Sequence, residues 1–345
     1  MVLTTSCENG DREFDDFDYQ TVYFAQQSPI RTIVLGDDVY DTSLDNEHKC
    51  KIMVTLGGVW TNRADRHVRI AVDNTLCDGL KFSDGRDVLA MPESYYRLTS
   101  TEITIPTGQV TGGSVVELTD AFFADPLALE ANYVIPVKII SADVDSILSG
   151  VAKVENPVLT HAGDWSTQPM NYQLYAIKYK NKMHGAWLSH GIDELNTNGV
   201  ATTVNREPQY IENADVRYLS SLGLNSSLYN VSTTVDLKVK NDAGEIVDGK
   251  LTLTCGLRLD FDNSDNCTIS TTSADCTASG SGKWEYKAAK KAWGDQDRDQ
   301  ITLEYEIKYN YMELGEPRYR ILKAKDVLVM RDRQSKFETF SFTNN

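Results

Sequence analysis

The feature that most limits the fold of this chain is the recurrence of short runs in which apolar and polar residues alternate. In such a run, successive side chains point to opposite faces of an extended strand, so one face can be buried while the other meets water. In the first part of the chain the runs are rich in β-branched residues and are separated by Gly, Pro and Asp. They include TVYFA, RTIVLG, KIMVTLGG and HVRIAVD. This pattern predicts an antiparallel β-sandwich.

The second part of the chain has longer runs of the same kind. NYQLYAIKYKNK spans residues 171–182 and DQITLEYEIKYNYME spans residues 299–313. Another pair of runs flanks NDAGE, residues 241–245, whose Asn, Asp and Gly are typical of a hairpin turn. Long strands joined by tight turns predict an up-and-down barrel. Only YIENADVRYLSSLGL, residues 210–224, suggests a helix in this part.

A change in composition marks the expected domain boundary. Residues 143–164 are small and polar, which is typical of a linker. We therefore expect an acidic leader over residues 1–19, a β-sandwich over 20–142, a linker over 143–164 and a β-barrel over 165–345. In the sandwich, residues 118–131 (LTDAFFADPLALEA) form the main helical or loop insertion.

The chain is strongly acidic, with a formal net charge of -16 over 345 residues. Such a charge repels nucleic-acid phosphates, so nucleic acid is excluded as a partner. No apolar run approaches the roughly 20 residues that a membrane-spanning helix needs.

Six cysteines lie at positions 7, 50, 77, 255, 267 and 276. No pair has the CxxC spacing of a zinc ribbon. If Cys7 is set aside, five remain, and an odd number cannot all pair within the chain. Cys267 and Cys276 flank a polar stretch that resembles a hairpin tip, so they are a candidate disulfide in an oxidising compartment.

The other chemical motifs are weak. The acidic string LDFDNSDN, residues 259–266, lacks the Gly and the Glu of a calcium-binding loop, and its best interpretation is a solvated loop. His184 and His190 do not have the spacing of a metalloprotease helix. No nucleophile motif and no phosphate-binding glycine loop is present. We therefore expect no metal, no cofactor and no enzymatic activity.

The five tryptophans offer a different chemistry. An exposed aromatic ring can cover the flat C–H face of a sugar while polar neighbours bind its hydroxyl groups. Buried rings instead fill a core, because each can bury ~150–250 Å². Our candidates for glycan binding are Trp60, Trp165, Trp187 and Trp293.

Several segments together resemble a known family. TVYFAQQ, VTLGGVWTNRAD, MPESYYRL, IPTGQVTGGSVVELTD and YVIPVKI occur in that order. They resemble the N-terminal immunoglobulin-like module of Bacteroidota surface lipoproteins from polysaccharide-utilisation systems. KYKNKMHGAWLSHG, GKWEY, KAWGDQDRDQITLEYEI and KDVLVMRDR resemble the lipocalin-like domain that often follows it. The resemblance covers roughly residues 20–140 and 165–340.

The resemblance implies an all-β protein, with an immunoglobulin-like β-sandwich followed by a lipocalin-like antiparallel β-barrel. It implies a non-enzymatic, glycan-binding lipoprotein on the extracellular face of the outer membrane, beside an import complex. Such lipoproteins carry a lipid on a cysteine that precedes an acidic tract. Here Cys7 follows Leu3-Thr4-Thr5-Ser6 and precedes six acidic residues, so it is the implied attachment site, with Met1 the remnant of a longer signal peptide.

Two other functions fit the same sequence. One is an adhesin or structural component that binds another protein, for which an exposed apolar patch would be the sign. The other is a carrier of a small ligand in the barrel lumen, which would need an open, dry cavity there.

Overall fold

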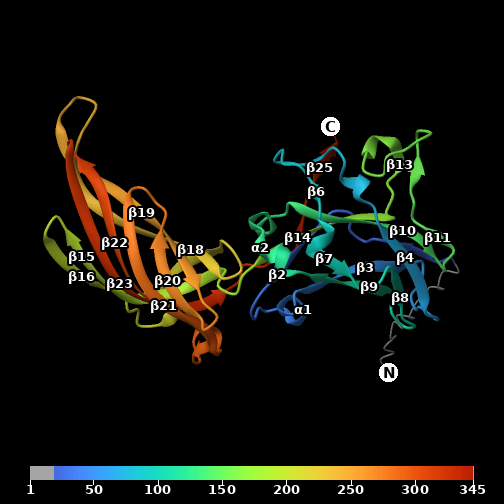
Figure 1. Ribbon diagram of the computed structural model, residues 1–345, viewed down its shortest axis with the longest axis horizontal. Coiled ribbons are helices and arrows are strands. Elements are labelled where there is room, and N and C mark those ends of the chain that lie inside the picture. The colour runs from blue at the N-terminus through green and yellow to red at the C-terminus, as the bar shows by residue number, and fades with distance from the viewer. Residues whose placement is uncertain (1–18, 345) are drawn as a thin grey trace, which may run out of the picture.

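Strand pairing divides the chain into two β domains in a computed structural model that describes residues 19–344 (Figure 1). The first domain runs from β1 (Thr21–Tyr23) to β14 (Tyr172–Lys180), and the second from β15 (Gly185–Thr197) to β23 (Glu316–Asp332). The chain then returns to the first domain, where its C-terminal end lies (Figure 1). The all-β fold class is confirmed.

The N-terminal domain is built from two main sheets. One has the strand order β11-β1-β3-β9-β7, and the other has the order β24-β2-β14-β10-β4-β8 with β6 paired to β10. Two small sheets, β12-β13 and β25-β5, lie beside them. The strands not yet delimited are β2 (Pro29–Val34), β3 (Lys49–Gly57), β4 (Arg66–Val72), β5 (Leu80–Phe82), β6 (Leu89–Ala90), β7 (Tyr96–Leu98), β8 (Glu102–Ile105), β9 (Thr111–Leu118), β10 (Tyr133–Ala142), β11 (Ser146–Ile147), β12 (Val151–Ala152), β13 (Trp165–Thr167), β24 (Glu338–Thr339) and β25 (Phe342–Asn344).

Strand β14 corrects the expected domain boundary. We assigned residues 165–345 to the barrel, but β14 pairs with β10 and, in parallel, with β2, so it lies in the N-terminal domain. Tyr175 and Ile177 pack into the core between the two main sheets, whereas Leu174 and Ala176 pack on the opposite face. A strand buried on both faces is apolar at nearly every position. The sequence of β14 suits this central place as well as it suits a barrel.

The expected linker is also ordered within the N-terminal domain. Strand β11 pairs in parallel with β1, and β12 pairs with β13. A 3-10 turn, η4 (Ala162–Asp164), lies between β12 and β13. The region therefore builds part of the domain instead of separating two domains.

The second domain is one antiparallel sheet that closes on itself. Its strand order is β16-β15-β17-β18-β19-β20-β21-β22-β23, and β23 also pairs with β15. Its apolar residues alternate along the long strands and meet inside, as expected for a barrel. The remaining strands are β16 (Val200–Asn205), β17 (Asp215–Ser221), β18 (Ser226–Lys240), β19 (Ile246–Phe261), β20 (Asn266–Thr271), β21 (Cys276–Ala289) and β22 (Arg298–Glu313).

Along one of its edges, strand β15 pairs with two different strands. It pairs with β17 up to Ser189 and with β16 from Ile192 onward. Gly191 lies between these two stretches with a φ of 146°, and a Cβ there would come within 1.9 Å of the Lys325 carbonyl oxygen. Glycine is needed at this point because β15 and β23 approach each other too closely for a side chain.

The structure contains the expected hairpin turn and the helical insertion, but not the helix expected over residues 210–224. The hairpin at residues 241–245 is confirmed, since β18 and β19 pair from Ser226↔Asp260 to Lys240↔Ile246. The helical insertion in the first domain consists of α2 (Asp120–Ala124) and η3 (Pro126–Leu129), and α1 (Ser43–Asn46) lies earlier. The helix over residues 210–224 is wrong. After η5 (Ile211–Asn213), this segment forms β17, which places Leu219 in the barrel core.

The predicted Cys267–Cys276 disulfide is also wrong. Cys276 is bonded to Cys255, and Cys267 is a buried free thiol. Cys255 and Cys276 both point into the barrel core, from β19 and β21, on either side of β20.

Cys7 lies outside the described residues. Within residues 19–344, no helix is long and apolar enough to cross a membrane.

One arginine joins the two domains. The guanidinium of Arg333, which is 1 % exposed, donates to Asp299 Oδ2 at 2.9 Å within the barrel. It also donates to the Asp37 carbonyl oxygen at 2.9 Å and to the Lys182 carbonyl oxygen. Lys287 and Tyr286 reach the Asp37 carboxylate from the barrel at 2.7 and 2.8 Å. This charged junction fixes the 37–39 loop of the N-terminal domain against the barrel.

Candidate functional site

Side chains of the barrel itself occupy its interior. Leu257, Leu303 and Tyr309 are among the fully buried residues there. A polar network lies among them, in which Tyr229 and Tyr305 donate to Asp326 Oδ2 at 2.9 and 2.8 Å. Burial, together with the Asp326 carboxylate, raises the pKa of Tyr229, so its hydroxyl remains a donor. A lumen packed in this way argues against a carrier of small ligands.

Two of the four candidate tryptophans are structural. Trp187 is fully buried in the barrel core, where its Nε1 donates to the Met183 carbonyl oxygen at 2.9 Å. Trp165 is 7 % exposed, and its Nε1 donates to the Val158 carbonyl oxygen at 2.9 Å. Buried rings with satisfied N–H groups cannot act as sugar platforms without local unfolding.

The other two lie on different domains. Trp60 follows β3 in the N-terminal domain and is 70 % exposed. Trp293 lies on the barrel, half-buried, with the Arg331 guanidinium 5.5 Å from its ring centroid. It lines a cavity of about 570 Å³ at the domain junction together with Asp37 and Lys287. The structure therefore does not gather the four candidates on one surface.

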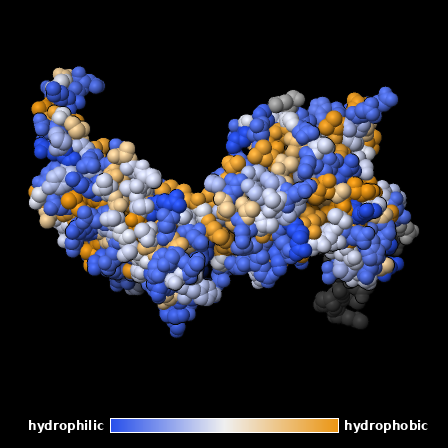
Figure 2. Space-filling view, in the orientation of Figure 1, coloured by the Kyte–Doolittle hydropathy of each residue, from blue (hydrophilic) through white to orange (hydrophobic). Residues whose placement is uncertain are grey.

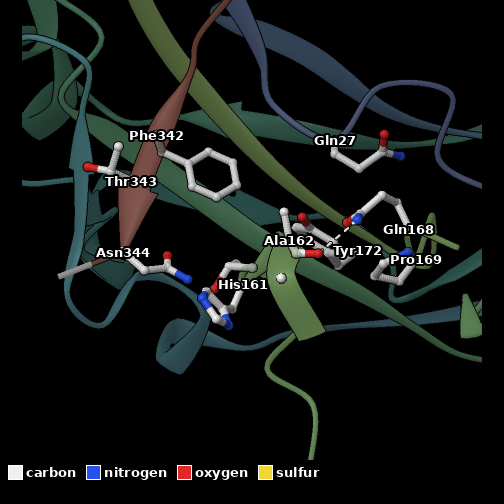
Figure 3. Close-up of a pocket in the computed structure, with 11 residues that line it drawn as sticks. Gln27, His161, Ala162, Gln168, Pro169, Tyr172, Phe342, Thr343 and Asn344 are labelled. Carbon is white, nitrogen blue, oxygen red and sulfur yellow. Dashed lines mark hydrogen bonds between the residues drawn. The ribbon is translucent and has the colours of Figure 1, made fainter. Parts of the chain in front are cut away.

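The cavity best suited to a ligand lies instead in the N-terminal domain (Figure 3). It has a volume of about 650 Å³, and we call it the amide pocket because three side-chain amides line it. An aromatic ring, that of Phe342, faces it in Figure 3. Its lining residues are Gln27, Thr160, His161, Ala162, Gly163, Gln168, Pro169, Tyr172, Phe342, Thr343 and Asn344.

Four separate segments build the amide pocket. Strand β25 carries Phe342 and is held in place by its pairing with β5, in register Phe342↔Phe82. The η4 turn and the residues around it form a second part of the lining, and Trp165 holds this segment through its hydrogen bond to the Val158 carbonyl oxygen. Tyr172 enters at the start of β14, and Gln27 lies in the turn between β1 and β2.

Hydrogen bonds orient the polar groups of the pocket. Gln27 Nε2 donates to the Phe24 carbonyl oxygen at 2.7 Å, and Gln168 Nε2 donates to the Ala162 carbonyl oxygen at 3.0 Å (Figure 3). A carboxamide has two N–H donors and an acceptor oxygen with two lone pairs, so one bond uses only part of its capacity. The unused donors and lone pairs can therefore bind a ligand, while the existing hydrogen bond holds the side chain in place.

The histidine of the pocket is positioned by an acid behind it. His161 Nδ1 lies 2.5 Å from Asp164 Oδ1, and Asp164 Oδ2 accepts from the Val158 backbone N–H at 2.9 Å. The Val158 N–H and then His161 lower the pKa of Asp164, so this carboxylate stays ionised. With Nδ1 engaged, the His161 ring presents its Nε2 edge away from Asp164.

The chemistry of this lining suits a neutral, polyhydroxylated ligand. Amides, hydroxyl groups and an imidazole can bind hydroxyl groups, and Phe342 can cover an apolar C–H face. Among residues 19–344, no Asp or Glu side chain lines the pocket. Within residues 19–344, no group of three or more metal-binding side chains is present.

Analysis of the sequence missed the residues of the amide pocket. Gln27 and Phe342 lie at opposite ends of the chain, and only the return of the C-terminal strands to the first domain brings them together. No local pattern marks such a site. The clue in the sequence was the aromatic FSF near the C-terminus, residues 340–342, which continues past the last long strand.

Each half of the chain matches a protein family. Residues 182–334 match DUF5627, a domain of unknown function, and this span coincides with the closed barrel from β15 to β23. Residues 17–146 match a family described as an N-terminal domain. No curated protein matches the chain.

Solved structures from Bacteroides are also similar. A Bacteroides ovatus protein of unknown function is 39% identical, with a TM-score of 0.81, over 95% of this chain and 100% of that chain. A multidomain protein with DUF1735, also from B. ovatus, is 14% identical over 90% of this chain and 94% of that chain, with a TM-score of 0.38. An auxiliary nutrient binding protein from Bacteroides thetaiotaomicron is 12% identical over 87% of this chain and 90% of that chain, with a TM-score of 0.36.

Proposed function

We propose that this chain, which belongs to the family of the Bacteroides ovatus protein of unknown function, is a non-enzymatic glycan-binding protein. The observation that carries the proposal is the amide pocket. It combines three side-chain amides, two of them held by hydrogen bonds, with the ring of Phe342 around a cavity of about 650 Å³, a volume typical of ligand pockets.

A location outside the cell accompanies this proposal. The Cys255–Cys276 disulfide supports it, because such bonds persist in oxidising compartments. We place the protein on the extracellular face of the outer membrane, with a lipid on Cys7, beside a complex that imports the captured glycan.

Affinity gel electrophoresis tests the binding. Native gels cast with a panel of neutral and acidic polysaccharides, host mucin included, are run with the wild-type chain and with variants. We expect retardation by at least one neutral polysaccharide. Phe342→Ala and, separately, Gln168→Ala should weaken it about tenfold, as expected for the loss of one well-placed ring or hydrogen bond. Because Gln168 is exposed, we expect Gln168→Ala to keep the fold. It therefore tests the pocket even if Phe342→Ala fails to fold.

Trp60→Ala is the matched comparison, because Trp60 is an exposed ring that does not line this pocket. We expect it to bind as the wild type does. If Trp60→Ala abolished retardation and the two pocket variants did not, the amide pocket would not be the site. If no polysaccharide retarded the wild type, the glycan-binding function itself would be wrong.

Mass spectrometry tests the anchor. The full-length precursor, expressed in its native host, should yield a mature N-terminus at Cys7 that carries lipid. An unmodified peptide that runs through Thr5-Ser6-Cys7 in the mature protein would contradict the lipid attachment.

A further inference from the structure

A second cavity lies where the chain returns from the barrel to the N-terminal domain. Its volume is about 380 Å³, and we call it the junction pocket. One wall is strand β2, a second is the segment before α1, and the third is formed by residues 335–337, which lead from the barrel to β24. It adjoins the cavity that contains Trp293, since Asp38 lines both.

Three buried oxygen atoms in this lining lack a hydrogen-bond partner among the described residues. They are Thr32 Oγ1, Asp38 Oδ2 and Ser335 Oγ. Thr32 is 8 % exposed, so its hydroxyl cannot reach bulk water easily. Buried polar atoms are almost always paired, because an unpaired one loses its hydration without compensation. Because each of these atoms is closed to solvent, a polar ligand in the cavity would satisfy them only after the side chains that cover them move.

Two aromatic rings flank the same cavity. Tyr40 is 60 % exposed and Phe337 is 72 % exposed. A single exposed ring is common on a protein surface and needs no explanation. Here two rings, from segments nearly 300 residues apart in sequence, border the cavity that holds the unpaired oxygens. Apolar rings beside hydroxyl and carboxylate oxygens match the two kinds of surface that a sugar presents.

The charges in the lining limit the kinds of ligand that can bind. Asp45 is already occupied, because it accepts from Arg31 and from the Val34 backbone N–H. Asp41 accepts from the backbone N–H and hydroxyl of Ser43, which lower its pKa. The Asp38 carboxylate oxygen can only accept, so its ligand must offer a donor such as a hydroxyl group. Arg31, which pairs with Asp45, and Lys336 also line the pocket, so three carboxylates against two cations leave a net charge of -1. An acidic sugar would therefore meet weak repulsion.

We propose that the junction pocket is a second saccharide-binding site, selective for neutral sugars. A sugar ring lies against Tyr40 and Phe337, and its hydroxyl groups bind Asp38, Thr32 and Ser335. The proposal rests on the glycan-binding function argued above and adds to it a separate site at the domain junction, with a charge preference.

Isothermal titration calorimetry tests the proposal on the purified chain. The probes are the tetrasaccharides of mannose, xylose, glucose and galactose, with tetragalacturonate as the acidic counterpart. We expect two binding events for the best neutral probe. The double variant Tyr40→Ala/Phe337→Ala should lose one of them, with affinity at that site reduced about tenfold or more. Phe342→Ala should lose the other.

Two further variants make the test specific. Thr32→Val keeps the shape of the side chain and removes only the hydroxyl, so it should weaken the junction site with the fold preserved. Tyr210→Ala is the matched control, because Tyr210 has the same 60 % exposure as Tyr40 but lies on the barrel outside this lining. It should bind as the wild type does.

Each result decides between the two proposals. A single binding event that depends on Phe342 and not on Tyr40 and Phe337 would overturn the junction site and leave the proposed function intact. Binding that depends only on Tyr40 and Phe337 would support the junction site and reject the amide pocket. Absence of binding by every neutral probe overturns the junction site, and the polysaccharide gels then decide the proposed function independently. Equal affinity of the junction site for tetragalacturonate would overturn its charge preference.

Discussion

Arg333 is the single residue on which the joint between the two domains depends most. Its guanidinium is fully buried and pairs with the buried carboxylate of Asp299. Removing one member of a buried ion pair leaves the other charge without compensation, which typically destabilises a protein by ~3–5 kcal/mol. We expect Arg333→Met to lower the free energy of unfolding by about this amount in urea titrations followed by circular dichroism.

The neighbouring Arg331 provides the control for this prediction. It is half exposed and contacts the face of Trp293, so Arg331→Met should change the free energy of unfolding by about 1 kcal/mol or less. The double variant Arg333→Met/Asp299→Asn should recover part of the lost stability, because no buried charge then lacks a partner. Equal effects of the Arg331 and Arg333 single variants would show that the buried pair does not stabilise the junction.

His184 makes the stability of the barrel depend on pH. Burial, with smaller contributions from Lys180 and Arg333, lowers its pKa from 6.5 to about 4. Its Nδ1 accepts from the Ser221 backbone N–H at 3.2 Å, which also favours the neutral ring. Between pH 4 and 6.5 the unfolded chain therefore binds a proton that the folded chain does not. Stability should fall as the pH drops through this window, by on the order of 3 kcal/mol in total.

Comparison with His184→Asn separates the effect of His184 from that of the carboxylates, which titrate in a similar pH range. Asparagine can still accept from the Ser221 N–H but does not titrate. The difference in free energy of unfolding between wild type and variant should therefore change between pH 6.5 and 4 and stay constant above pH 7.5. A difference that is independent of pH would mean that His184 is protonated in the folded protein as readily as in the unfolded one.

At the scale of secondary-structure elements, the disulfide stabilises the barrel across three strands. Cys255 on β19 and Cys276 on β21 are separated by 21 residues, and β20 lies within the loop that they close. A loop of this length restricts the unfolded chain by about 3 kcal/mol. We expect Cys255→Ala/Cys276→Ala to lose roughly that much stability in urea. Cys267→Ala, which removes only a buried free thiol, should lose about 1 kcal/mol, and equal losses would contradict the role of the bond.

The sequence predicted most strands correctly, but it did not predict reliably which domain or which neighbouring strands they join. Alternation identified β14 as a strand, but a strand buried on both faces resembles a strand of a barrel, so its domain was misassigned. Residues 210–224 lack a regular alternation of apolar and polar residues, so the sequence did not show a strand there. Pairing with β15 and β18 nevertheless holds Asp215–Ser221 in an extended form as β17. Cys255 was missed as a disulfide partner because it is distant in sequence and only the β19–β21 arrangement brings it near Cys276.

At the scale of the whole molecule, neither pocket could be predicted from local patterns. Phe342 and Phe337 lie after the last long strand, where a sequence shows only a short aromatic tail. Their partners, Gln27 and Tyr40, lie near the other end of the chain. The barrel is inserted between the two parts of the N-terminal domain, so both pockets exist only when the C-terminal strands dock. The tryptophans suggested the chemistry of sugar binding, but two of them fill cores instead.

This insertion predicts that the N-terminal domain depends on the end of the chain. Phe340 is buried against Phe82, with ring centroids 5.0 Å apart, in a core that also contains Leu174. Phe340→Ala should therefore lower stability by about 3 kcal/mol. Hydrogen exchange followed by mass spectrometry should show faster exchange in β2 and β5, with β19–β22 of the barrel unchanged. Thr339→Ala, an exposed neighbour, should leave both domains protected. Uniform loss of protection in both domains would instead mean that they unfold as one cooperative unit.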